Sequence, residues 1–146
     1  MREAIGGTWI FSIVIVFIVL FSSYLAISVN YSKAFKVKNG IINIIEKNEG
    51  LTEDAKSEIN DYLSTVGYYV YHSCASDEKG FEPATGGTTT KYKYCISKRE
   101  SGDGTFRKTY YYVRVFFRLD LPILGDIFTF PVTGETKAVY FAPNSM

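Results

Sequence analysis

The feature that most constrains this chain is an uncharged stretch near its N-terminus, which runs from Ala4 to Ser32. Within it, residues 9–29 are 21 consecutive apolar, aromatic or small residues. A helix of that length spans roughly 31 Å, which matches the hydrocarbon thickness of a bilayer. A charge at its centre would cost about 2.5–3.5 kcal/mol on insertion. The stretch therefore predicts a transmembrane helix at residues 9–29, after a short leader-like segment at residues 1–8.

A cleaved secretory signal peptide is the alternative, with Ala26 to Ser28 as an acceptable cleavage site. However, apolar residues continue at three- and four-residue steps well beyond this point. Gly50 then supplies a C-terminal stop. We therefore expect one helix from about Ala4 to about Asn48, with residues 30–50 forming an amphipathic extension outside the membrane.

The apolar part of this helix carries aliphatic and aromatic side chains on all sides. Such a surface can be buried in lipid or in a bundle of identical helices. The stretch contains no charged residue that would indicate a transport function. We expect the lipid bilayer as one partner, and helix packing through Ile10, Ile13, Phe17 and Phe21.

Residues 51–146 have the composition of a small folded domain with many tyrosines. Thr52 is a good N-cap, and the two acidic residues after it favour a helix at residues 53–65. Extended segments are predicted at residues 68–74, 91–98, 106–121 and 132–141, and the second and third of these have residues that alternate between two faces. Pro122, Gly125 and Pro131 are expected to break the chain between the last two. The predicted class is α+β, with a transmembrane helix extended into an amphipathic stalk, a short second helix and an antiparallel sheet of about four strands.

Cys74 and Cys95 flank a predicted loop at residues 75–90. A disulfide between them would fasten this loop, and closing 20 intervening residues contributes about 3 kcal/mol through chain entropy. The alternative is a pair of unrelated thiols in a cytosolic protein. A disulfide favours an oxidising, extracytoplasmic location for residues 51–146.

The lysines that follow the apolar stretch would instead place this domain in the cytoplasm. We give this less weight because large C-terminal domains translocate largely regardless of flanking charge. The expected protein is thus a single-pass cell-membrane protein with an extracytoplasmic domain.

The sequence indicates no enzymatic, cofactor or metal chemistry. His72 is the only histidine, and strand alternation would point it away from Ser73. Metal-ligand spacings such as C-x-x-C are absent from the sequence. The net charge is +1, and basic residues between tyrosines suit the solvated face of a sheet. We therefore expect no nucleic-acid partner.

Three features occur in order along the chain. Gly6-Gly7 precedes the apolar helix, VNYSKAFKVKN at residues 29–39 begins its extension, and VRVFFRLDLPILGDIFTFPVTGETKAVYF at residues 113–141 closes the sheet. This arrangement resembles type IV pilin-like proteins, most closely the TadE-like minor pilins or pseudopilins of tight-adherence pilus systems. The similarity is architectural and extends along the whole chain.

This resemblance implies a non-enzymatic subunit or assembly factor of a bacterial filament, whose partners are other pilin-like subunits or assembly proteins. It also implies that a prepilin peptidase processes the chain after Gly6 or Gly7, and that the product reaches a surface filament. The alternative hypothesis is a membrane-tethered module. Its Tyr-rich sheet face, or the loop at residues 75–90, would recognise a ligand or cell-surface component.

Overall fold

The structure is a computed structural model that describes residues 2–74, 80–83, 91–102, 107–121 and 125–141. The expected α+β class, with one helix that could cross a membrane, is confirmed. The elements, in chain order, are α1 (Arg2–Lys47), α2 (Glu53–Thr65), β1 (Glu82–Pro83), β2 (Tyr94–Ser101), β3 (Arg107–Leu121), β4 (Gly125–Glu135) and β5 (Val139–Phe141).

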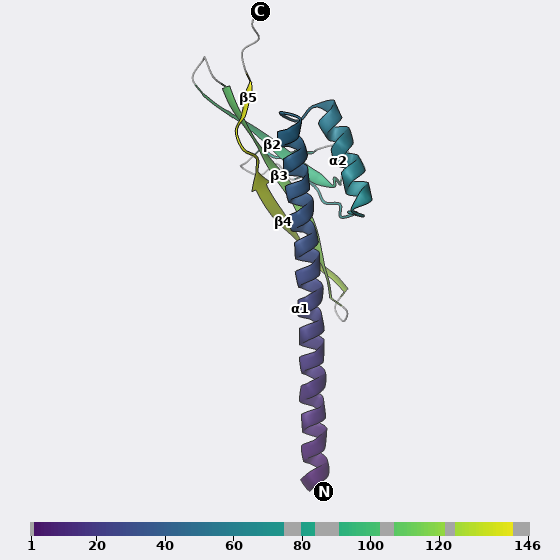
Figure 1. The fold of residues 1–146 in the computed structure, drawn as a ribbon. Coiled ribbons are helices and arrows are strands. Elements are labelled where there is room, and N and C mark those ends of the chain that lie inside the picture. Colours follow the sequence, from purple (N-terminus) through teal and green to yellow (C-terminus); the bar gives the residue numbers. More distant parts are fainter. Residues whose placement is uncertain (1, 75–79, 84–90, 103–106, 122–124, 142–146) are drawn as a thin grey trace, which may run out of the picture.

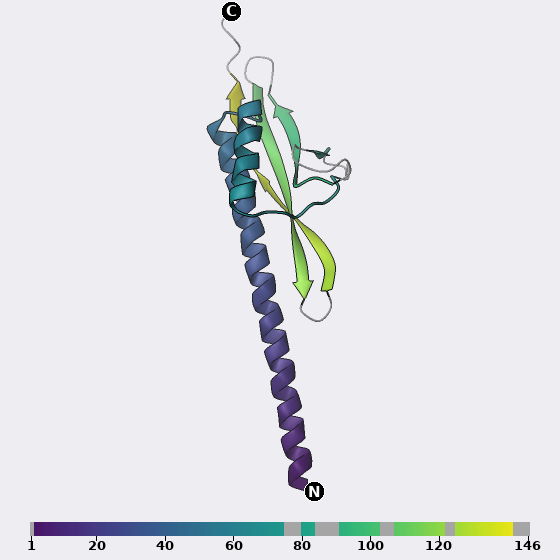
Figure 2. The same cartoon turned by 90° about the vertical axis from the view of Figure 1, so that its right-hand side faces the viewer.

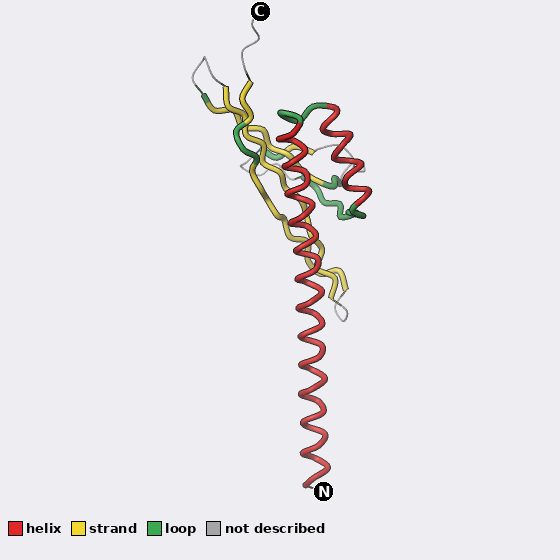
Figure 3. The backbone as a smooth tube through the Cα atoms, viewed as in Figure 1, coloured by secondary structure: helices red, strands yellow, loops and turns green. Residues whose placement is uncertain are grey.

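Helix α1 is unbroken over 46 residues and has two different environments. Its C-terminal half lies against the sheet and α2, while its N-terminal half projects away from the domain as a bare rod (Figures 1 and 2). Figure 3 shows no interruption of the helix between these halves. One element therefore serves as both the candidate membrane span and a layer of the folded domain.

The sheet is antiparallel, with strand order β1-β2-β3-β4, and β5 also pairs with β3. β4 pairs with β3 as far as Tyr112, and β5 pairs with the beginning of β3 from Thr109. Between them, the amide of Thr136 donates to the carbonyl of Tyr111 at 2.9 Å, and its hydroxyl accepts from the amide of Tyr111 at 3.0 Å. Thr136 thus keeps the ladder satisfied between β4 and β5.

The main core lies between the helices and one face of the sheet, and Figure 2 shows both helices on that side. It consists of small and branched residues of α1, one face of α2 and alternate residues of β2 and β3. Its fully buried members include Val37, Ile41, Ile45, Ala55, Ile59, Leu63, Tyr94, Val113 and Val115. The predicted amphipathic extension is therefore the central element of this core.

Helix α2 has the predicted bounds, and its N-cap explains its beginning. The hydroxyl of Thr52 accepts from the amide of Ala55 at 3.1 Å, as expected of an N-cap threonine. After the helix, Gly67 has a φ of +64°, in the left-handed region that glycine adopts easily. The chain can therefore turn there towards the sheet.

One helix position and one strand position depend on the absence of a side chain. A Cβ at Gly40 would overlap the ring of Tyr62 in α2, whose hydroxyl donates to the carbonyl of Lys36 at 3.2 Å. A Cβ at Gly134 in β4 would lie 2.7 Å from side-chain atoms of Lys38 and Ile42. These glycines allow α1 to approach both α2 and β4 closely.

The prediction of a strand at residues 68–74 is wrong. This segment forms only an isolated bridge between His72 and Tyr92, and β1 is the strand that pairs with β2, at Cys95 and Ile96. The short β1 lies within the predicted loop at residues 75–90, and most of that loop is outside the described residues. β2 begins three residues later than predicted, at Tyr94.

The predicted break at Pro131 and Gly125 is also wrong, because both residues belong to β4. Pro131 lies opposite Phe116 on an edge strand, where the missing proline N–H removes little from the ladder. Pro122 is outside the described residues. β3 confirms the predicted long strand, with a register shift between Leu119 and Asp120.

The Gly40–Tyr62 contact predicts that Gly40→Ala changes the stability in opposite directions, depending on whether Tyr62 is present. Gly40→Ala is expected to destabilise the native chain by about 1–3 kcal/mol, because the added methyl displaces the Tyr62 ring. In a Tyr62→Ala background the same change should stabilise by about 1 kcal/mol, which is the helix propensity difference. Thermal unfolding of the detergent-solubilised chain, followed by near-UV circular dichroism, measures both. An effect of the same sign in both backgrounds would contradict the contact.

Candidate functional site

The candidate functional site is the projecting half of α1 together with its junction with the domain. All four predicted helix-packing residues are exposed, with Ile10 at 65%, Ile13 at 52%, Phe17 at 69% and Phe21 at 55%. The described residues contain one helix long and apolar enough to cross a membrane, and the domain buries none of its most apolar window. A surface of this kind needs lipid or other helices to cover it.

Gly6 and Gly7 lie within α1 and are exposed. An added Cβ at either position would meet no atom within 4 Å, so the domain does not shield this part of the helix. The leader-like segment is helical from Arg2. Processing at these glycines stays a prediction.

A row of aromatic side chains joins the domain to the middle of α1. The rings of Tyr31 and Phe117 meet edge to face, with centroids 5.6 Å apart. Phe117 stacks on Phe130 at 5.3 Å, and Phe130 lies 6.0 Å from Phe128. We call these four residues the aromatic row. The sequence placed Phe117 on a sheet face, but pairing across β3 and β4 required the strand register.

A cleft of about 230 Å³ lies beside the aromatic row, between α1, the chain after α2 and β3. Two of its lining residues, Lys33 and Arg118, are cationic, and Asn30 adds a polar amide. The ammonium of Lys33 donates to the carbonyl of Gly67 at 2.8 Å, which holds this side chain at the cleft wall. Sequence reasoning missed the cleft, because its residues come from three distant segments.

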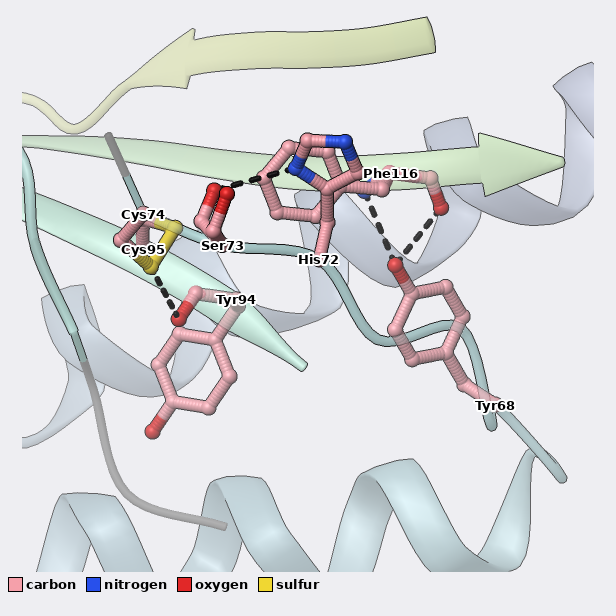
Figure 4. Close-up of a disulfide and its surroundings, with 7 residues drawn as sticks. All are labelled: Tyr68, His72, Ser73, Cys74, Tyr94, Cys95 and Phe116. Atoms are coloured by element: carbon pink, nitrogen blue, oxygen red, sulfur yellow. Dashed lines mark hydrogen bonds between the residues drawn. A yellow bond between two sulfur atoms is a disulfide. The ribbon is translucent and has the colours of Figure 1, made fainter. Parts of the chain in front are cut away.

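Tyr68, which also lines the cleft, closes the end of the sheet (Figure 4). Its hydroxyl donates to the carbonyl of Phe116 at 2.6 Å and accepts from the Phe116 amide at 2.9 Å. β2 stops pairing with β3 one residue earlier, at Val115. Burial raises the pKa of the Tyr68 hydroxyl, which keeps it protonated as a donor. One phenol therefore satisfies both backbone groups of Phe116.

The predicted disulfide between Cys74 and Cys95 is confirmed, with a Cα–Cα distance of 5.7 Å. It lies on the face of the sheet away from the helices, in a small second core with Phe81 and Phe116. Figure 4 shows the disulfide close to Ser73 and Tyr94. The bond ties the segment after α2 to β2. It therefore secures a part of the chain that pairs with the sheet only through one isolated bridge.

The structure gives His72 a packing environment. Its ring stacks on Phe116 with centroids 4.7 Å apart, and its Nδ1 lies 3.0 Å from the backbone oxygen of Ser73 (Figure 4). Cys74 is held in the disulfide, so it offers no thiol. Within the described ranges, no group of three His, Cys, Asp or Glu residues could hold a metal ion.

Several basic residues in or next to the sheet lie over aromatic rings. The guanidinium of Arg114 is 3.9 Å from the ring centroid of Phe81, and the ammonium of Lys93 is 5.8 Å from those of Tyr69 and Tyr71. Such cation–π contacts are favourable within the molecule. These basic residues therefore have aromatic partners within the molecule.

The disulfide should stabilise the domain by about 3 kcal/mol, because it closes a loop of about 20 residues in the unfolded chain. The double variant Cys74→Ser, Cys95→Ser is expected to lose this amount in thermal or denaturant unfolding. Alkylation of the native protein followed by mass measurement should add no label before reduction and two labels after it. Labelling without reductant would contradict the bond.

Tyr68→Phe should destabilise the protein by about 1–3 kcal/mol, because it leaves the amide and carbonyl of Phe116 buried without their partner. Tyr69→Phe is the matched control, since Tyr69 is adjacent and exposed. That control should change the free energy of unfolding by less than about 0.5 kcal/mol. Equal effects of the two variants would show that the Tyr68 hydroxyl has no special role.

Comparison of the chain with protein-family models, with curated proteins and with solved structures yields no match.

Proposed function

We propose that the chain is a non-enzymatic, pilin-like membrane protein that acts as a subunit or assembly factor of a bacterial type IV filament system of the tight-adherence kind. The observation that carries this proposal is that α1 is both part of the domain core and an exposed apolar helix. Residues 34–45 of this helix pack in the centre of the domain core. Towards the N-terminus, the same helix continues as an exposed apolar rod. A filament subunit that is surrounded first by lipid and later by neighbouring helices needs an apolar helix that is joined rigidly to its domain.

The exposed rod suits assembly with other helices as well as anchoring in lipid. Large apolar residues cover all its sides, including Trp9, Phe11 and Phe17 as well as aliphatic residues between them. It therefore offers contact in every direction, as a helix in the centre of a bundle requires. In this proposal the domain faces the extracytoplasmic side, where the Cys74–Cys95 disulfide is stable.

A membrane-tethered binding module is the second candidate. The observation that favours it is the exposed pair Tyr69 and Tyr71, with Lys93 near both rings. Exposed tyrosines present flat amphipathic surfaces for a ligand. The loop at residues 75–90, which would accompany them, lies mostly outside the described residues.

The decisive experiment is the intact mass of the protein recovered from native cells, in both the membrane fraction and the sheared surface fraction. A filament subunit should appear in the sheared fraction and should lack only the residues up to Gly6 or Gly7. A photo-crosslinker at Phe17 should join two projecting helices there, whereas one at the exposed Ser57 of α2 should not give the same product.

Other masses distinguish the remaining hypotheses. A chain that keeps Met1 and stays in the membrane fraction would favour an assembly factor or the binding module. Loss of everything before Val29 would identify a secretory signal peptide and overturn the filament proposal. Ligand binding that persists after deletion of residues 1–29 would favour the binding module.

A further inference from the structure

The cleft between α1, the segment after α2 and β3 lies at a defined position along α1, next to the end of its uncharged stretch. Lys33 is the first charged residue after the uncharged stretch that begins at Ala4. It therefore marks where α1 leaves the apolar phase, since a cation prefers the aqueous side of the membrane surface. Asn30 and Ala34, within one turn of it, also line the cleft. The cleft thus opens at the expected height of lipid headgroups.

The β3–β4 hairpin independently indicates the same level. The end of β3 and the beginning of β4 extend along α1 towards the N-terminus further than any other described part of the domain (Figures 1 and 2). The contact between Tyr31 and Phe117 holds this part of β3 beside the end of the apolar stretch of α1. Phe128 is 56% exposed and Phe130 is 42% exposed. Exposed aromatic rings at this height suit the membrane–water interface, where aromatic residues concentrate.

The chemistry of the cleft is that of an anion site. Lys33 and Arg118 line it from two different elements, and the residues described in its lining include no carboxylate. The bond from Lys33 to the carbonyl of Gly67 uses one of the three donors of an ammonium group. A volume of about 230 Å³ can admit a phosphate group with its glycerol. Phosphate oxygens are strong acceptors for both kinds of cation.

We propose that this cleft binds the headgroup phosphate of an anionic phospholipid in the membrane that α1 crosses. Lys33 and Arg118 bind the phosphate, and the aromatic row rests in the interface beside the acyl chains. This contact seats the domain against the bilayer in one orientation. It requires membrane insertion of α1 but not filament assembly, so the two proposals can fail separately.

The test uses the full chain with its disulfide intact, in detergent micelles, with lipid binding counted by native mass spectrometry. Phosphatidylglycerol should be retained in preference to phosphatidylcholine of the same acyl chains. Lys33→Gln and Arg118→Gln should each weaken phosphatidylglycerol binding about fivefold, the effect expected of one cation near an anionic lipid surface. Added salt should also weaken it.

Lys36→Gln is the matched control, because Lys36 is an exposed lysine on the same helix that does not line the cleft. It should leave the preference unchanged, and near-UV circular dichroism should show that all three variants remain folded. An equal loss in Lys36→Gln would attribute binding to diffuse surface charge and overturn the proposal. Equal retention of the two lipids would also overturn it.

Inorganic phosphate separates a lipid site from a general phosphate site. If the lipid is the ligand, millimolar phosphate at constant ionic strength should not displace phosphatidylglycerol, because the acyl chains and the aromatic row contribute to its binding. Full displacement by phosphate would show that the cleft takes the anion alone, and the assignment to a membrane lipid would be wrong.

Discussion

The packing of the second half of α1 against β3 is the interaction on which the rest of the structure depends. Val37, Ile41 and Ile45 are fully buried there, opposite Val113 and Val115. Burial of such side chains contributes about 1.5–3 kcal/mol each. Because α1 continues without a break towards the N-terminus, the same contact fixes the direction in which the bare apolar half leaves the domain. The half of α1 that packs in the core and the half that could cross a membrane are therefore parts of one continuous helix.

The remainder of the domain is fitted around that helix by a few specific contacts. Gly40 and Gly134 bring α2 and β4 close to α1. The segment after α2 has almost no strand pairing of its own, and it is held by the Tyr68 hydroxyl at one end and by the disulfide at the other. These contacts also shape the cleft at the junction. The proposed lipid site is thus a consequence of how the chain crosses from α2 to the sheet.

Much of this architecture could be predicted from local patterns. Helix α2 was predicted with its observed bounds, because Thr52 and the acidic residues after it form a complete N-terminal cap. β3 was predicted to within one residue, because its alternation is long. The predictions that were wrong concern strand ends and edges. Residues 68–74 have the composition of a strand, and Pro131 resembles a break, but strand pairing decided both cases.

The sequence by itself determined the division of the chain into an uncharged apolar half-helix and a Tyr-rich α+β domain, because hydrophobic periodicity and caps are local properties. It also indicated the pairing of its only two cysteines. Only the tertiary structure decided that Lys33 and Arg118 share a cleft, and that Tyr31 meets Phe117. Those contacts join residues more than 80 positions apart, and they depend on strand register and helix approach. No local pattern specifies such distances.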